Sequence, residues 1–76
     1  MPISAYIFIE CSTDPADVIP EVRRIDGVQQ AHAVFGDIEA IAVVEADDLR
    51  ALDDIIGSLY DVEGVETTET HIAREV

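Results

Sequence analysis

The sequence contains no Lys and only four Arg, against 17 Asp and Glu, which gives its 76 residues a formal net charge of −13. A chain this poor in positive charge cannot neutralise phosphate groups, so we expect no direct binding to nucleic acid. Its single cysteine, Cys11, excludes an intrachain disulfide and a cysteine-based zinc site.

Long apolar runs are also missing. The runs present are far shorter than the roughly 20 residues of a membrane span. The first ten residues contain no positive charge of the kind that opens a signal peptide. We therefore expect a cytoplasmic protein that does not interact with a membrane.

The sequence is nevertheless rich in apolar residues, which make up 49% of it. Disordered acidic chains are poor in such residues, so we expect residues 1–76 to fold, and their number allows a single domain. The large negative charge opposes the compact state, whereas at about 1 M salt the screening length falls to roughly 3 Å. The composition is therefore typical of a halophile protein. The alternative is an ordinary acidic protein with a solvated charged face.

Hydrophobic periodicity divides the chain into six elements. The pattern predicts, in order, a strand over 5–11, a helix ending at Asp26-Gly27, strands over 28–35 and 38–45, a helix capped by Asp47 or Asp48, and a strand over 65–73. If Asp14 caps the first helix, Pro20 lies inside it and should kink it, whereas an Asp17 cap places Pro20 in the first turn. Only Gly36-Asp37 separates the second and third strands, which predicts a tight hairpin.

The order β-α-β-β-α-β contains an internal repeat. Ile25-Asp26-Gly27-Val28 matches Val62-Glu63-Gly64-Val65, 37 positions later, and each marks a helix end, a glycine cap and a strand start. With right-handed crossovers, two such halves build an α+β fold, in which a four-stranded antiparallel sheet has the order 4-1-3-2 and both helices cover one face.

Both faces of the two central strands are apolar. One face is predicted to carry Ala5, Ile7, Ile9, Ala40, Ala42 and Val44, and the other Tyr6, Phe8, Ile41 and Val43. Two helices can cover only one of these faces. We therefore expect a second chain to cover the other face, most simply in a two-fold homodimer.

Several motifs, taken in order, resemble the ligand-binding domain of the Lrp/AsnC regulators, also called the RAM domain. These motifs are Gly36-Asp37-Ile38-Glu39, Asp47-Asp48-Leu49 and Gly64-Val65-Glu66-Thr67-Thr68-Glu69-Thr70. The resemblance runs from Ala5 to Ala73 and lacks the DNA-binding domain that usually precedes this module, so the chain is similar to the stand-alone form. Ile38 and Glu39 replace the aromatic residue and Asp that are usual in the hairpin.

The resemblance implies a ferredoxin-like fold and a dimeric α+β barrel, with further assembly in which an octamer is favoured. It implies no catalysis, and we separately expect no cofactor and no metal. The effector would be an amino acid or a related small molecule bound between dimers, and full-length Lrp/AsnC regulators are possible partners through the same interfaces.

The site residues that this resemblance predicts are Gly36, Asp37 and Glu39 of the hairpin with Thr68 and Thr70 of the last strand. Glu39 would attract the ammonium of the effector, and the hairpin amides would bind its carboxylate. The alternative is that these are ordinary turn and strand residues.

Other chemistry has less support in the sequence. His32 and His71 fall on the predicted edge strands, so one chain cannot join them in a metal site. Cys11 has no His or Arg close to it in sequence, and acidic pairs such as Asp53-Asp54 fit a solvated face. The rival functions are a small enzyme of the dimeric α+β barrel type and a purely structural oligomerisation module.

Overall fold

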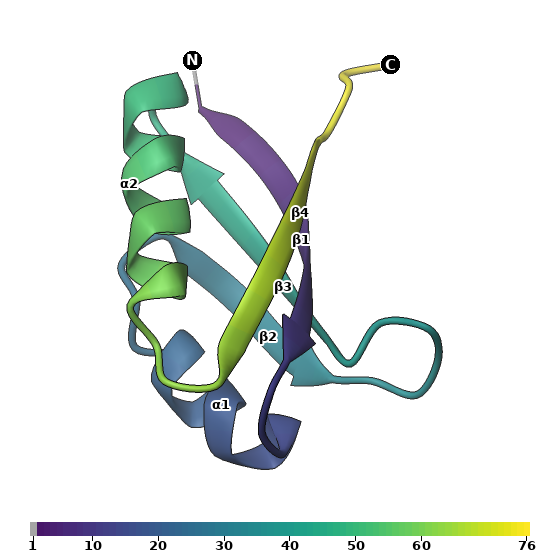
Figure 1. The fold of residues 1–76 in the computed structure, drawn as a ribbon. Coiled ribbons are helices and arrows are strands. Elements are labelled where there is room, and N and C mark those ends of the chain that lie inside the picture. Colours follow the sequence, from purple (N-terminus) through teal and green to yellow (C-terminus); the bar gives the residue numbers. More distant parts are fainter. Residues whose placement is uncertain (1) are drawn as a thin grey trace.

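The structure is a computed structural model that describes residues 2–76. Its elements follow the predicted order: β1 (Ile3–Cys11), α1 (Pro15–Val22), β2 (Val28–Ala33), β3 (Ala40–Ala46), α2 (Leu49–Tyr60) and β4 (Val65–Ile72). The strands form one antiparallel sheet in the order β2-β3-β1-β4, and both helices lie on one face of it (Figure 1). This is the predicted order read from the opposite edge, so the ferredoxin-like α+β fold is confirmed.

The core lies between the helices and the sheet. The sheet contributes the residues of the predicted helix-side face, all of them fully buried: Ala5, Ile7, Ile9, Ala40, Ala42 and Val44. The helices contribute the apolar stripes Val18, Ile19 and Val22 from α1, and Leu52, Ile55 and Leu59 from α2. Full burial of each larger aliphatic side chain is worth about 1.5–3 kcal/mol, so this layer provides most of the driving force for folding.

Aspartate side chains start both helices. Asp14 Oδ1 accepts from the Ala16 N–H at 2.9 Å, and Asp48 Oδ1 accepts from the Ala51 N–H at 2.8 Å. Because Asp14 is the cap, Pro20 lies inside α1 and not in its first turn. The pattern left both caps ambiguous, and these hydrogen bonds settle them.

The internal repeat is visible in the backbone. Gly27 and Gly64 adopt φ of 96° and 97°, in the left-handed region, and connect each helix to the strand that follows it. At Gly64 a β-carbon would collide with Thr13 Oγ1 and lie 2.8 Å from Val18 Cγ2. These two positions therefore require glycine for both conformation and space.

The tight hairpin predicted at Gly36-Asp37 is wrong. β2 ends at Ala33, which pairs with Ala40 of β3, and residues 34–39 between them form a longer loop. The Val34 N–H donates to the Glu39 carbonyl at 3.0 Å and closes this loop at its base. Residues 34–35 and 38–39, which were predicted to extend the strands, therefore leave the sheet.

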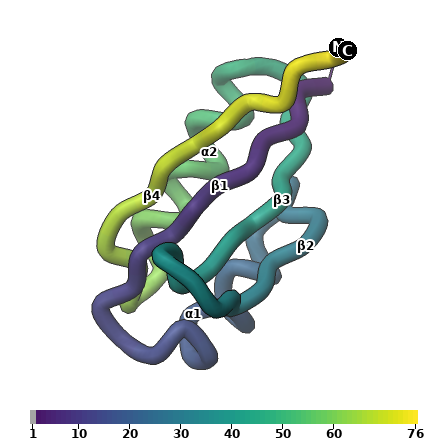
Figure 2. Tube along the Cα trace, turned by 90° about the vertical axis from the view of Figure 1, so that its right-hand side faces the viewer, coloured from purple at the N-terminus to yellow at the C-terminus, as the bar shows by residue number. Residues whose placement is uncertain are grey.

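Within residues 2–76, no helix lies on the second face of the sheet. Figure 2 is turned toward this open face, which presents Tyr6, Phe8, Ile41 and Val43. Tyr6 is 47% exposed, whereas its neighbours Ala5 and Ile7 are completely buried. No helix in the described part of the chain is long and apolar enough to cross a membrane.

Candidate functional site

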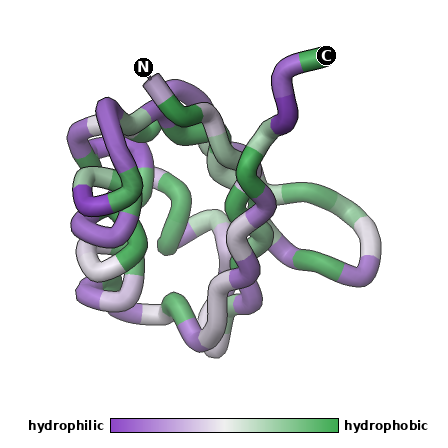
Figure 3. The backbone as a smooth tube through the Cα atoms, turned by 90° about the horizontal axis from the view of Figure 1, so that it is seen from above, coloured by the Kyte–Doolittle hydropathy of each residue, from purple (hydrophilic) through white to green (hydrophobic). Residues whose placement is uncertain are grey.

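The loop of residues 34–39, here called the hairpin loop, projects from the sheet on the side opposite the helices (Figures 1 and 3). Phe35 is fully exposed in it, and Asp37 is exposed as well. A β-carbon added at Gly36 would meet no atom within 4 Å, so the backbone here is open to an approaching molecule. The loop therefore offers accessible main-chain groups next to the open face.

The side chain of Glu39 makes a long-range hydrogen bond. Its Oε1 accepts from the backbone N–H of Cys11, at the end of β1, at 2.9 Å. Partial burial raises the pKa of the Cys11 thiol, and the negative charge of Glu39 raises it further. Glu39 is therefore an anchored carboxylate and not a freely solvated one.

Thr68 and Thr70 lie on the same side of β4, as their spacing predicts. They pair with Ile9 and Ile7, which are buried under the helices, so both threonines face the helix layer. The Thr68 N–H donates to the Tyr60 hydroxyl at 3.1 Å. Hydrogen bonding from Thr68, first through its side chain and then through its backbone, lowers the pKa of Tyr60.

One chain therefore does not bring all the predicted residues together. Gly36, Asp37 and Glu39 share the hairpin loop on the open side, whereas Thr68 and Thr70 face the other side of the sheet. A cavity of about 220 Å³ lies beside the loop and is lined by Ile38, Phe8 and residues 67–69, among others. Ligand sites usually measure roughly 300–1,000 Å³, so this cavity is smaller than is usual for a ligand site.

The open face also carries a cluster that was not singled out from the sequence. His71 Nε2 lies 2.8 Å from Glu69 Oε2, and the His71 ring lies 4.7 Å from the Phe8 ring between centroids. Glu69 and His71 pair with Phe8 and Tyr6 of β1, so they lie on the same face as those residues. The sequence could have indicated this only if the pairing of β4 with β1 had been known. His32 lies on the opposite edge strand, as predicted, so the two histidines do not meet.

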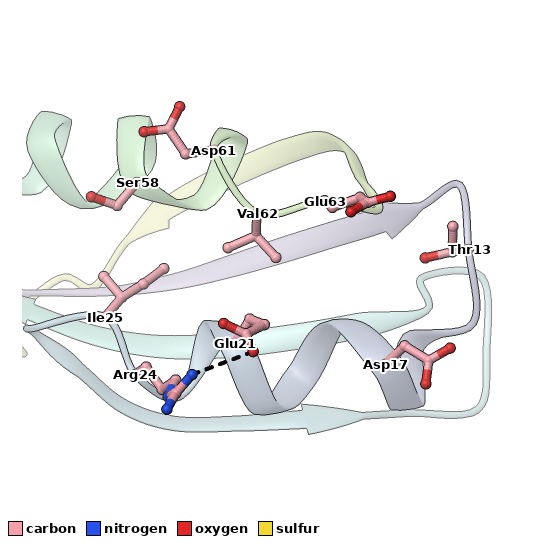
Figure 4. A pocket seen from close by; sticks show the side chains of 9 residues that line it. All are labelled: Thr13, Asp17, Glu21, Arg24, Ile25, Ser58, Asp61, Val62 and Glu63. Carbon is pink, nitrogen blue, oxygen red and sulfur yellow. Dashed lines mark ion pairs between the residues drawn. The ribbon is translucent and has the colours of Figure 1, made fainter.

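A larger cavity lies elsewhere. A groove of about 650 Å³ runs between the C-terminal ends of α1 and α2, and Figure 4 shows the side chains around it. Ile25 and Val62, equivalent positions of the internal repeat, face it together with Asp17, Glu21, Asp61 and Glu63. Arg24 in the same groove pairs with Glu21 at 3.5 Å. None of the predicted site residues lies here, and across residues 2–76 no three potential metal ligands converge.

The fold defines a class of protein: a small ferredoxin-like α+β domain whose sheet has one uncovered apolar face. The chain belongs to the Lrp/AsnC ligand binding domain family, whose model matches residues 4–76. No curated protein matches the sequence significantly.

Solved structures agree with this family. TTHA0845 from Thermus thermophilus is 26% identical with a TM-score of 0.89, and the match covers 97% of this chain and 95% of that one. Escherichia coli AsnC is 19% identical with a TM-score of 0.87, and the match covers 97% of this chain but 52% of AsnC.

The feast or famine regulatory protein Rv3291c from M. tuberculosis was solved in complex with L-methionine. It is 23% identical with a TM-score of 0.82, over 97% of this chain and 51% of that protein. This chain therefore spans about half the length of the two regulators. At such identities these two likenesses concern the fold alone.

Proposed function

We propose that this chain is a non-enzymatic effector-binding and oligomerisation module that senses an amino acid or a related small molecule. The observation that carries the proposal is the exposed hairpin loop with an anchored carboxylate at its base. An amino acid needs an anion near its ammonium and N–H donors near its carboxylate. Glu39 and the amides of Gly36 and Asp37 supply these groups on one loop. The L-methionine complex of Rv3291c supports this class of effector.

Assembly completes the proposed site. A second copy covers the open face around Phe8 and Val43 in a two-fold dimer, and dimers associate further, with an octamer favoured. Thr68 and Thr70 face away from that dimer interface. They therefore contact the hairpin loop of a neighbouring dimer. The effector then binds at the junction between dimers, where no single chain supplies every contact.

The chain carries out this role in the cytoplasm. By the same interfaces it joins full-length Lrp/AsnC regulators and modulates transcription through them. Its net charge of −13 disfavours acidic ligands, so neutral and basic amino acids are the better candidates.

Two rival functions differ in what they require. An enzyme of the dimeric α+β barrel type would use the space between the helices and the sheet, but a packed core that includes Ile7, Ala42 and Val44 at zero exposure fills that space. A purely structural module would share the assembly but would need no effector. The effector screen separates this second rival from the proposed function.

The proposal is tested by a thermal-shift screen of the common amino acids in molar KCl. A ligand at about ten times its Kd adds roughly 1.4 kcal/mol of stability. For a domain of this size, about 1 kcal/mol corresponds to a rise of roughly 4–8 °C in Tm.

Variants locate the site. Glu39→Ala should abolish the shift, and Thr70→Val should weaken binding by about 0.5–1.5 kcal/mol, the worth of one hydrogen bond. Glu21→Ala, in the helix groove, is the matched control and should respond like the original chain. If no amino acid shifts Tm, the structural-module function replaces effector sensing.

A further inference from the structure

Glu39 makes two hydrogen bonds with different groups. Its backbone carbonyl accepts from the Val34 N–H at 3.0 Å and closes the hairpin loop on itself. Its side-chain Oε1 accepts from the Cys11 N–H at 2.9 Å, which connects the loop to a strand 28 residues earlier in the sequence. One residue therefore fixes both the shape of the loop and its position on the domain.

The place of the second bond follows from the sheet. Pairing between β1 and β3 ends at Ile9 and Ala40, after which β3 gives way to the hairpin loop. In an antiparallel ladder the amides of alternate residues point to the same neighbouring strand. The Cys11 amide, two residues beyond Ile9, therefore points to the same side as the Ile9 amide, toward β3, but at a level that β3 no longer reaches. The carboxylate of Glu39, the residue before Ala40, takes the place of the missing main-chain acceptor.

The other side of β1 is irregular at the same point. The register between β1 and β4 shifts between Glu10 and Cys11, and the next amide, that of Ser12, donates to the Gly64 carbonyl at 2.8 Å. The end of β1 is thus held by one side-chain acceptor and one main-chain acceptor. A hydrogen bond from an amide to a carboxylate is stronger than a bond between neutral groups.

We propose that Glu39 is a positioning residue that clamps the hairpin loop to the end of β1. The clamp uses Oε1, and Oε2 stays available for the ammonium of an effector. This last point rests on the proposed function, whereas the clamp itself does not. Glu39 thus presets the amides of Gly36 and Asp37 before any ligand arrives.

Side-chain length and charge separate the two roles. Glu39→Gln keeps an acceptor oxygen at the same reach but removes the negative charge. Glu39→Asp keeps the charge but shortens the side chain by one carbon–carbon bond, about 1.5 Å, which takes the carboxylate beyond hydrogen-bonding distance of the Cys11 amide. Glu39→Ala removes both the acceptor and the charge.

Amide hydrogen exchange followed by NMR tests the clamp without any effector. We expect the Cys11 amide to be protected in the original chain and in Glu39→Gln. In Glu39→Asp and Glu39→Ala it should exchange about 10- to 100-fold faster, the range given by hydrogen bonds to charged groups. The Ser12 amide is the internal control and should keep its protection in all four proteins.

Unchanged exchange at Cys11 in Glu39→Ala, with Ser12 still protected, would overturn the clamp. If the Ser12 amide also loses its protection in Glu39→Ala, the comparison of Glu39→Gln with Glu39→Asp decides. Equal exchange at the Cys11 amide in these two variants contradicts the clamp. Faster exchange in Glu39→Asp alone supports it.

L-Methionine is the probe for the second oxygen. Weaker binding to Glu39→Gln, with the Cys11 amide still protected, supports pairing of Oε2 with the ammonium, and unchanged binding overturns that pairing. If L-methionine and the other amino acids bind none of these proteins, the proposed function fails while the exchange result at Cys11 still decides the clamp.

Discussion

Val43 provides the sharpest perturbation of the proposed dimer. It lies on β3 in the middle of the open face, where it pairs with Tyr6 of β1 on one side and Gln30 of β2 on the other. Val43→Asp would place a carboxylate in an interface that is otherwise apolar at its centre. A two-fold axis would repeat this change in both copies.

The expected cost follows from the burial of this position. Covering the open face would take the carboxylate out of water, which costs several kcal/mol for each ion even after the protein relaxes. Two copies at about 2 kcal/mol each, the low end of this range, give an expected loss of about 4 kcal/mol for the dimer. Since about 1.4 kcal/mol is a factor of ten, the Kd for dimerisation should rise roughly 1,000-fold.

Sedimentation equilibrium in molar KCl over micromolar concentrations measures this change. Leu49→Asp is the matched control, because Leu49 is 63% exposed at the start of α2, on the helix side, and the variant has the same net charge. The control should assemble like the original chain, while Val43→Asp should sediment as a monomer with its circular dichroism unchanged. Assembly of Val43→Asp at the original strength would refute the open face as the interface.

Three further predictions concern charge, backbone and the thiol. Tm should rise from about 0.1 M to 2 M KCl because screening removes repulsion among the carboxylates, and a flat or falling Tm contradicts this. Gly64→Ala should lower the free energy of unfolding by at least about 1–2 kcal/mol, because the backbone of Gly64 is left-handed. Gly57→Ala, in open space within α2, should raise it by up to about 1 kcal/mol. Chemical denaturation measures both changes. Glu39→Gln should lower the pKa of Cys11, because it removes a negative charge that disfavours the thiolate. Iodoacetamide should then alkylate Cys11 faster at mildly alkaline pH. A slower reaction would contradict the contact between Glu39 and Cys11.

The regular part of the fold was predictable because its signals are local. Alternation in β1 and β3 placed all six predicted helix-side residues correctly, as the zero exposure of Ala5, Ile7 and Val44 shows, but it missed Ala46. Gly27 and Gly64 both have positive φ, as the glycine repeat predicts, but they lie just before the next strands and not at the helix ends. The predicted helix end at Asp26-Gly27 is wrong, because α1 ends at Val22 and turns connect it to Gly27. Right-handed crossovers then predicted the strand order 4-1-3-2, and the observed strand pairing confirms it.

The hairpin was not predictable in the same way. Ile38 is β-branched and apolar, like most residues of β3, so the sequence pattern extends that strand two residues too far. Where these residues leave the sheet, the Glu39 side chain accepts a hydrogen bond from the Cys11 N–H, 28 residues earlier in the sequence. A local sequence pattern does not encode such a contact.

The candidate site was predictable only in part, for a related reason. The spacing of Thr68 and Thr70 places both on one side of a strand, but which side depends on the pairing with Ile9 and Ile7. A shift of one residue in that pairing would reverse the answer. The membership of Gly36, Asp37, Glu39, Thr68 and Thr70 in one effector site stays a prediction.

The central claim, that this domain binds an amino acid at its hairpin loop, is tested most directly by titrating the ¹⁵N-labelled chain with L-methionine and the basic amino acids in molar KCl. NMR then follows each backbone amide. The account predicts saturable shifts at the amides of Gly36 and Asp37, with smaller ones at Thr68 and Thr70. Shifts confined to the helix groove around Ser58 and Val62, or no saturable shift with any amino acid, would contradict it.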